Sequence, residues 1–302
     1  MASPRTLACA ALASVVIAGG TAGACYVQAR AHSGAGVVSS AAASSTGEAA
    51  VEQVETVVEP VVDRDALLAR AMAEVSVADG AEVSVAVLDL GTGERAGYGD
   101  GSFDTASIVK VDILAALLLQ AQDAGRGLTV AEEAYATAMI VSSDNASASA
   151  LWRAIGRAEG LDAANERFGL TATEGGDGTL WGLTRTTAAD QLTLLGQVFG
   201  DDSKLSAASR TYLRELMGRI DAGQDWGVSA VADGSSWALK NGWLPRTATG
   251  LWDVNSIGRV TADGHDCLLA VLSDGNATKE RGVALVEAVA GAAVRAVGAS
   301  GS

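Results

Sequence analysis

Hydrophobic and polar positions alternate along the chain in patterns that predict strands toward both ends and helices between them. Apolar residues spaced three or four apart from Val61 to Val75 predict an amphipathic helix. The apolar run Val83–Leu90 predicts a strand that turns at Gly91–Gly93 into a second strand near Tyr98. Near the other end the pattern predicts three strands and a closing helix, at Trp237–Lys240, Trp252–Val260, Asp266–Ser273 and Thr278–Val297.

The segment between these two groups of strands, from about Ser107 to Gly218, has helical periodicity interrupted by glycine-rich stretches. This order requires the first and last segments to build one sheet together. We therefore expect an α/β fold of the α+β type, with a five-stranded antiparallel sheet flanked by helices and an inserted all-helical lobe. A site where the two lobes meet would draw residues from both.

Composition narrows the possible partners. The chain has 302 residues, of which 49% are hydrophobic, enough for a substantial core. It carries 36 acidic and 21 basic residues, a formal net charge of -15. Because binding to a phosphate backbone needs clustered lysine and arginine, we expect no nucleic-acid partner. We also expect a monomeric protein.

The N-terminal region predicts export. Arg5 precedes an uncharged apolar stretch from Leu7 to Ala24, so residues 1–31 are interpreted as a signal peptide or a retained membrane anchor. Cys25 either carries a lipid or is discarded with the signal. Residues 32–60, rich in small and acidic side chains, predict a disordered linker, and residues 61–298 the folded domain. We expect contact with a membrane only through the N-terminal segment.

The few cysteines and histidines argue against a disulfide, a metal site and a serine–histidine triad. Cys9 and Cys25 lie in the N-terminal segment, so Cys267 stands alone in the domain and predicts a buried apolar residue rather than a disulfide. No cluster has metal-ligand spacing, and we expect neither a metal nor another cofactor. The chain has two histidines, His32 in a small-residue tail and His265 in a turn, which gives a serine–histidine triad almost no candidates.

Ser107 and Lys110 form the first candidate catalytic pair. They are three residues apart at the start of an apolar run, so in a helix they share one face. Burial disfavours the charged ammonium and would make a neutral amine available as a base for the serine. A position at a helix N-terminus would add free backbone N–H groups beside the reacting carbonyl.

Two further motifs follow in order. Ser143, Asp144 and Asn145 come after a helical stretch, and these residue types are also common helix N-caps. Lys240 and Gly242 end a predicted strand, with Asn241 between them. Each motif alone is a weak signal, but the ordered set is informative.

This ordered set resembles the motifs of class A β-lactamases and penicillin-binding proteins, and the likeness covers nearly all of residues 61–298. The resemblance implies a serine hydrolase that is acylated by a β-lactam or a peptidoglycan stem peptide. Its implied catalytic residues are the nucleophile Ser107, its base Lys110, the proton shuttle Ser143 and the electrostatic group Lys240. The implied substrate-binding residues are Asn145, Asn241, Gly242 and Trp243, with backbone N–H groups of Ser107 and Trp243 as the oxyanion hole.

The sequence departs from the family pattern at three places. The stretch from Ser107 to Ser143 is short, and Asn241 replaces a hydroxyl residue of the third motif. The loop before Thr186 lacks the glutamate pattern that supplies the deacylating base. Glu174 and Asp177 are the candidate replacements, although acidic residues also occur in glycine-rich turns for local hydrogen bonding.

Three functions therefore remain open: a β-lactamase-type hydrolase, a D-alanyl peptidase or transpeptidase, and a binding protein that has lost the reaction. Arg246 is either a ligand for a substrate carboxylate or a surface residue. Asp112 lies in the apolar helix without an assigned role.

Overall fold

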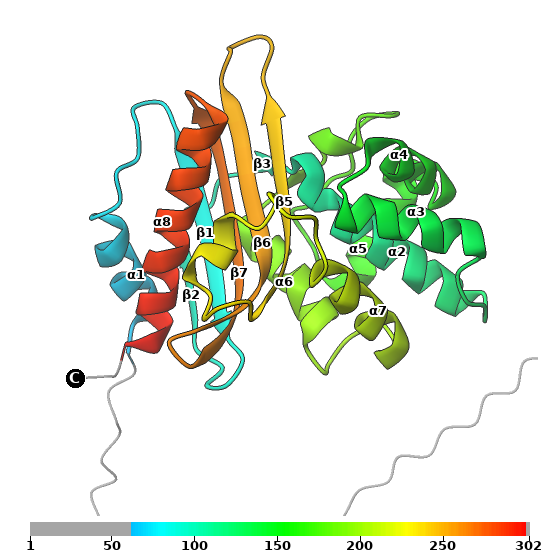
Figure 1. Ribbon diagram of the computed structural model, residues 1–302, viewed down its shortest axis with the longest axis horizontal. Coiled ribbons are helices and arrows are strands. Elements are labelled where there is room, and N and C mark those ends of the chain that lie inside the picture. Colours follow the sequence, from blue (N-terminus) through cyan, green and yellow to red (C-terminus); the bar gives the residue numbers. More distant parts are fainter. Residues whose placement is uncertain (1–61, 300–302) are drawn as a thin grey trace, which may run out of the picture. The chain divides into compact units, whose positions relative to one another are not determined.

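Five antiparallel strands form the main sheet of the computed structural model, which describes residues 62–299 (Figure 1). Across the sheet the strands run in the order β2 (Arg95–Tyr98), β1 (Glu82–Asp89), β7 (His265–Asn276), β6 (Trp252–Ala262) and β5 (Trp237–Pro245). Two strands come from the beginning of the domain and three from its end. The predicted fold, with one sheet built from both segments, is confirmed.

The pairing of β1 with β7 joins the two ends of the domain. Its register runs from Glu82 opposite Asp274 to Asp89 opposite Cys267. Central strands of this sheet are buried on both faces, so they are almost continuously apolar rather than alternating. Cys267 is a buried free thiol.

Helices α1 (Arg64–Met72) and α8 (Lys279–Gly298) cover one face of the sheet, and they lie side by side in Figure 1. Helix α1 begins later than the apolar pattern indicated because Asp63 caps it, its carboxylate accepting a hydrogen bond from the backbone N–H of Ala66 at 2.9 Å. Val75 lies beyond the helix end.

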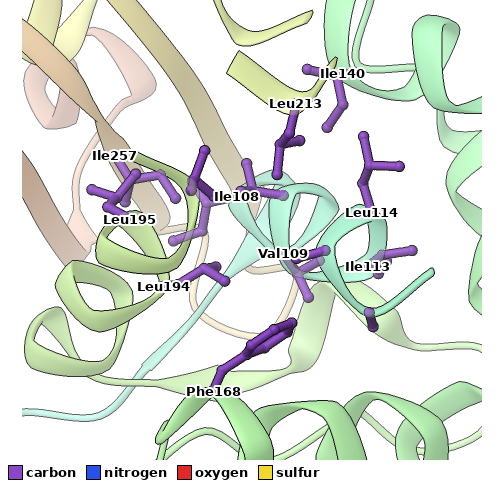
Figure 2. Close-up of a cluster of buried hydrophobic side chains, with 14 of the residues drawn as sticks. Ile108, Val109, Ile113, Leu114, Ile140, Phe168, Leu194, Leu195, Leu213 and Ile257 are labelled. Carbon is purple, nitrogen blue, oxygen red and sulfur yellow. The ribbon is translucent and has the colours of Figure 1, made fainter. Parts of the chain in front are cut away.

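The other face carries α6 (Ala188–Phe199) and the helical lobe. The lobe contains α2 (Val109–Asp123), α3 (Val130–Val141), α4 (Asn145–Ala154), α5 (Arg157–Phe168) and α7 (Ala207–Met217). Figure 2 shows how Ile108 and Val109, at the start of α2, lie among side chains of the lobe and of α6. Ile257 of β6 belongs to the same cluster, so this core fixes the start of α2 against the sheet.

Short elements complete the connections. A two-stranded sheet pairs β3 (Phe103–Asp104) with β4 (Arg185–Thr186), and three 3₁₀ turns occur at η1 (Ala106–Ile108), η2 (Trp181–Leu183) and η3 (Gly227–Val231). Ser107 lies in η1, which leads directly into α2, so a helix opens close to the serine as predicted, although Ser107 itself belongs to the 3₁₀ turn. Strand β5 also extends to Pro245, beyond the predicted end at Lys240.

The predicted signal or anchor, residues 1–31, and the predicted linker, residues 32–60, lie outside the described residues. Within residues 62–299, no helix combines the length and hydropathy needed to cross a membrane.

Asp112 is buried in α2 with no ionic partner. Its side chain has no exposed surface, and neither carboxylate oxygen accepts or donates a hydrogen bond. The Asn165 amide is buried and equally without a hydrogen bond. Burial raises the pKa of Asp112 to about 8, against a lowering effect of the neighbouring Asn165 amide, whose geometry falls short of a well-formed hydrogen bond, and with smaller raising effects of the Asp162 and Asp190 charges. The folded protein therefore holds a proton on Asp112 at neutral pH.

Asp112→Asn is expected to stabilise the protein at neutral pH. A pKa raised by folding means that the proton binds more tightly to the folded state, so stability falls as pH rises from the unfolded-state value near 4 toward about 8. The variant removes this loss, and its advantage over the wild type should grow by about 1.4 kcal/mol per pH unit between roughly pH 5 and 7. Urea unfolding at several pH values measures it. An advantage that does not change with pH would contradict the assignment, and Asp79→Asn at an exposed position is the control.

Candidate active site

The turn that carries Ser107 is held in a strained conformation. Ala106, directly before the serine, has φ of 48°, which is uncommon for a residue with a side chain. The backbone N–H of Thr105 donates to the carbonyl of Thr184 at 2.9 Å. Asn255 of β6 donates from its amide to the carbonyls of Asp104, at 2.9 Å, and Thr105, at 3.1 Å. The sheet and the β4 segment together fix the half-buried serine.

Lys110 joins the first motif to the second. Its ammonium nitrogen Nζ has no exposed surface around it and donates to three oxygens: the Ser143 carbonyl at 2.6 Å, the Ser143 hydroxyl at 3.0 Å and the Asn145 amide oxygen at 2.8 Å. Burial lowers the pKa of Lys110 to about 8, against an opposing effect from Asp144. No hydrogen bond joins Lys110 to the Ser107 hydroxyl among the described residues, because all three ammonium protons are engaged elsewhere.

Ser143, Asp144 and Asn145 form the turn between α3 and α4. Asp144 is the N-cap of α4 and accepts from the backbone N–H of Ser147 at 2.7 Å, so its residue type serves the helix. Ser143 has φ of 55°, which turns its carbonyl and hydroxyl toward Lys110. Asp144 therefore caps the helix, while its neighbours Ser143 and Asn145 contact Lys110.

Lys240 is the second buried ammonium. It is 1% exposed, and its one hydrogen bond goes to the adjacent carbonyl of Asn241 at 2.9 Å. Burial and, to a smaller extent, the positive charge of Lys110 together lower the pKa of Lys240 to about 7. No carboxylate among the described residues pairs with it. An anion that reached Lys240 would meet a cation that the protein has not neutralised.

Gly242 lets β5 approach the nucleophile. A Cβ atom at this position would lie 2.7 Å from the Ser107 backbone nitrogen and 2.8 Å from both the Ile108 nitrogen and the Thr105 carbonyl oxygen. These separations are shorter than any normal contact, so a side chain would push the strand away from the serine. The third motif therefore needs glycine for close packing.

Asn241 faces away from these groups, which corrects the predicted substrate contact. Strand alternation places its side chain on the face covered by α8 and η3. The amide donates to the carbonyls of Gln224, at 2.7 Å, and Trp226, at 2.9 Å, and the residue is 1% exposed. The side chain is thus structural. The third motif therefore offers no side-chain hydroxyl at position 241.

A cavity of about 390 Å³ opens beside Ser107. Its lining residues come from η1, α4, the η2 segment and β5: Ala106, Ser107, Asn145, Thr179, Leu180, Trp181, Gly182, Leu183, Trp243 and Leu244. None of these residues carries a carboxylate. Glu174 and Asp177, the predicted candidates for a deacylating base, are exposed and do not line the cavity.

The three sequence motifs thus meet in one place, where the two lobes are in contact. Ser107 and Asn145 line the same cavity, Lys110 joins Ser143 to Asn145, and Gly242 packs on the backbone of Ser107. The model of the β-lactamase enzyme family matches residues 67–133 and 124–297. The chain belongs to this β-lactamase family. No curated protein matches the sequence.

Solved structures share this β-lactamase fold. A mutant of PBP-A in an acyl-enzyme complex with penicillin G superimposes with a TM-score of 0.66 at 22% identity, covering 76% of this chain and 96% of that one. A β-lactamase from Xanthomonas campestris gives a TM-score of 0.60 at 24% identity, with 78% and 99% covered. The TLA-1 extended-spectrum β-lactamase gives 0.65 at 16%, with 76% and 96% covered.

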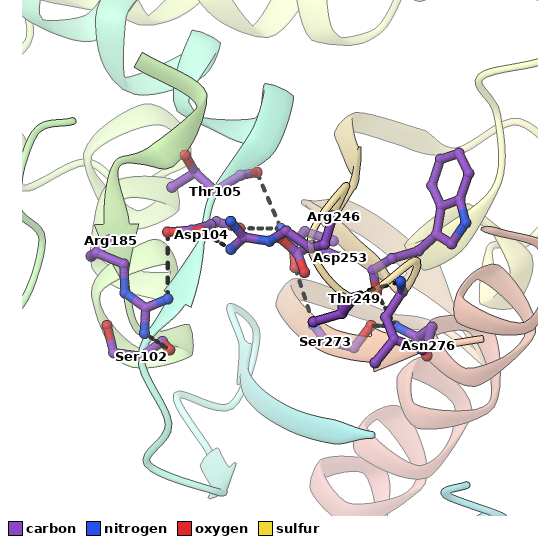
Figure 3. Close-up of polar contacts among 12 residues, drawn as sticks. Ser102, Asp104, Thr105, Arg185, Arg246, Thr249, Asp253, Ser273 and Asn276 are labelled. Carbon is purple, nitrogen blue, oxygen red and sulfur yellow. Dashed lines mark hydrogen bonds and ion pairs between the residues drawn. The ribbon is translucent and has the colours of Figure 1, made fainter. Parts of the chain in front are cut away.

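A group of ion pairs joins the segment just before Ser107 to neighbouring strands of this β-lactamase-family protein (Figure 3). Asp104, just before the nucleophile turn, pairs with Arg246 at the end of β5 and with Arg185 of β4 at 3.4 Å. Arg246 also pairs with Asp253 at 2.7 Å. Arg246, whose side chain is 33% exposed, therefore lies at the surface, one of the two positions considered from the sequence, and its ion pairs also tie three segments together.

Sequence reasoning missed Trp181. Its ring centroid lies 5.0 Å from the Lys110 ammonium, and its indole N–H donates to the Ser149 hydroxyl at 3.1 Å. A tryptophan within a glycine-rich loop was the available signal. Trp243, which was predicted to bind substrate, is among the residues that line the cavity. Its ring packs against the Trp226 ring, with centroids 5.9 Å apart, and the Lys279 ammonium lies over it. Within residues 62–299, no three histidine, cysteine or acidic side chains are grouped to hold a metal.

Proposed function

We propose that this member of the β-lactamase family is a serine hydrolase that forms an acyl-enzyme at Ser107 with a β-lactam or a related cell-wall amide. The observation that carries the proposal is the contact of one buried lysine, Lys110, with both functional side chains of the second motif, Ser143 and Asn145. Such a lysine is costly to bury, and its lowered pKa suits a base that works near neutral pH.

The acylation step follows from these groups. Loss of one proton from Lys110 releases one of its three contacts and supplies a lone pair for the Ser107 proton. The serine oxygen then forms a bond to the carbonyl carbon, and the carbon–nitrogen bond breaks. The departing nitrogen takes a proton from the Ser143 hydroxyl, which Lys110 can replace through their hydrogen bond at 3.0 Å.

The surroundings suit a negatively charged substrate. Lys240 supplies an unneutralised cation for a substrate carboxylate, and Asn145 supplies an amide for the substrate's own amide group. Backbone N–H groups of Ser107 and Trp243 are the proposed donors to the oxyanion. PBP-A, which has the same fold, is described as an acyl-enzyme complex with penicillin G.

The proposal includes export. Such substrates are found outside the cytoplasm, and the uncharged stretch from Leu7 to Ala24 supports secretion or attachment to the outer face of the membrane.

A second candidate function is that of a penicillin-binding protein whose acyl-enzyme persists. The absence of any carboxylate among the residues that line the cavity favours it, because hydrolysis of the ester needs a base to activate water. In this version the same acylation occurs, and release of the acyl group is slow.

Incubation with penicillin followed by intact-mass measurement tests the proposal. The wild type should gain the mass of one penicillin, and Ser107→Ala should gain none, whereas the control Ser235→Ala at an exposed position should behave as the wild type. An equal adduct on Ser107→Ala would defeat the proposal. The lifetime of the adduct after removal of free penicillin separates the hydrolase from the penicillin-binding protein.

A further inference from the structure

The cavity beside Ser107 has apolar walls on both sides. Leu180, Trp181 and Leu183 come from the η2 segment, and Trp243 and Leu244 come from β5. The polar side chains that line it belong to Ser107, Asn145 and Thr179, and none of its lining residues is charged. The two lysines of the site do not belong to this lining.

The η2 wall is held in place by its own hydrogen bonds. The carbonyl of Leu180 accepts from the Leu183 N–H at 2.8 Å, and the carbonyl of Trp181 accepts from the Thr184 N–H at 3.2 Å. The Trp181 indole is fixed by its bond to Ser149. A Cβ atom at Gly176 would lie 2.1 Å from the Leu180 carbonyl oxygen, so this segment packs closely against the preceding glycine-rich turn.

The rim of the cavity is also apolar. Leu180 is 53% exposed, and it is one of few large hydrophobic side chains with that much exposure among the described residues. On the opposite wall, β5 contributes Leu244 and Trp243. The Trp243 ring itself packs against Trp226, with the Lys279 ammonium 3.9 Å from its centroid, on the face of β5 that also carries the Asn241 side chain. An apolar wall that is preformed and partly open to solvent suits an apolar ligand group.

From these walls we infer that the enzyme selects acyl donors with an apolar side chain next to the scissile amide, aromatic or aliphatic, and discriminates against donors that are anionic there. This inference rests on the proposed acylation of Ser107. Burying a carboxylate against walls without a charged or strongly hydrogen-bonding partner costs free energy that an apolar group does not pay. Specificity therefore comes from the η2 and β5 walls, separately from the lysines that carry the chemistry.

Benzylpenicillin and carbenicillin form a matched pair of probes, because they differ by one carboxylate on the carbon between the phenyl ring and the side-chain carbonyl. The rate of adduct formation on the wild type is measured for each by intact mass, in about 0.3 M salt to screen the net negative charge of the protein. We expect acylation by benzylpenicillin to be at least about tenfold faster.

Leu180→Arg places a cation at the rim of the cavity and should reduce this preference at least about threefold by favouring carbenicillin. Val130→Arg is its control, because it adds the same charge at a residue of α3 that is 86% exposed and does not line the cavity. This control should leave the ratio of the two rates unchanged. Both replaced side chains are exposed, so both variants are expected to fold.

Equal rates with the two penicillins would overturn the inferred specificity while leaving the proposed function intact. An unchanged ratio in Leu180→Arg, or the same shift in Val130→Arg, would also overturn it. No adduct from either penicillin would defeat the proposed function itself and the inference with it.

Discussion

Lys110→Met is expected to slow acylation of Ser107 by roughly a hundredfold to ten-thousandfold, the usual contribution of a general base. Methionine fills much of the same volume without an amine, so the serine proton loses its acceptor. The variant also leaves the Ser143 carbonyl and hydroxyl and the Asn145 amide oxygen without their shared donor. Against this cost, it removes a fully buried charge, and we expect the fold to persist.

The rate of adduct formation with penicillin, measured by intact mass, gives the result directly. Lys204→Met, at an exposed position, is the matched control and should acylate at the wild-type rate. Thermal unfolding of both variants shows whether the fold has survived. A near-normal acylation rate in a folded Lys110→Met would mean that another group accepts the proton.

The acylation rate at low substrate concentration should follow a bell-shaped dependence on pH, with its maximum midway between the two lysine pKa values of about 7 and about 8. The reaction needs Lys110 neutral, and this form increases as pH rises through about 8. Binding of an anionic substrate needs Lys240 charged, and this form is lost as pH rises through about 7. Since the two ammonium groups repel each other, the observed values belong to the pair.

Lys240→Arg separates the two limbs of this profile. Arginine keeps its charge throughout the accessible pH range, so the decline on the alkaline side should disappear while the acid limb remains. In the wild type, each limb should approach a tenfold change in rate per pH unit. Circular dichroism across the same range excludes unfolding as the cause. A flat wild-type profile between about pH 6 and 9 would contradict the assigned roles of both lysines.

One sheet built from the first and last segments could be predicted because hydrophobic periodicity is a local signal and the order of elements along the chain leaves few topologies. The order of the strands across that sheet was not predicted. The site could be located because its three motifs are local as well. The orientation of Asn241 could not be predicted, since it depends on which face of β5 meets η3 and on the carbonyls of Gln224 and Trp226. Those carbonyls belong to a segment without a regular pattern.

Contacts between segments far apart in the chain could not be predicted from the sequence either. Three-residue spacing indicated that Lys110 would reach Ser107, but the turn between α3 and α4 brings three oxygens to the ammonium first. The ties of Arg246 to Asp104 and Asp253 depend on how three strands come together. Nothing in the pattern around any one of these residues specifies its partners.

The interleaved sheet has a consequence for biosynthesis. During translation the nucleophile leaves the ribosome well before Lys240, Gly242 and the strands β6 and β7 exist, and β1 waits for a partner from the far end of the domain. Pairings this remote form slowly, and until they form the serine has no neighbouring ammonium from β5. If Ser107 acts as proposed, its reactivity is therefore withheld from the nascent polypeptide until the final strands are made, and we expect a chain truncated before them to form no adduct with penicillin.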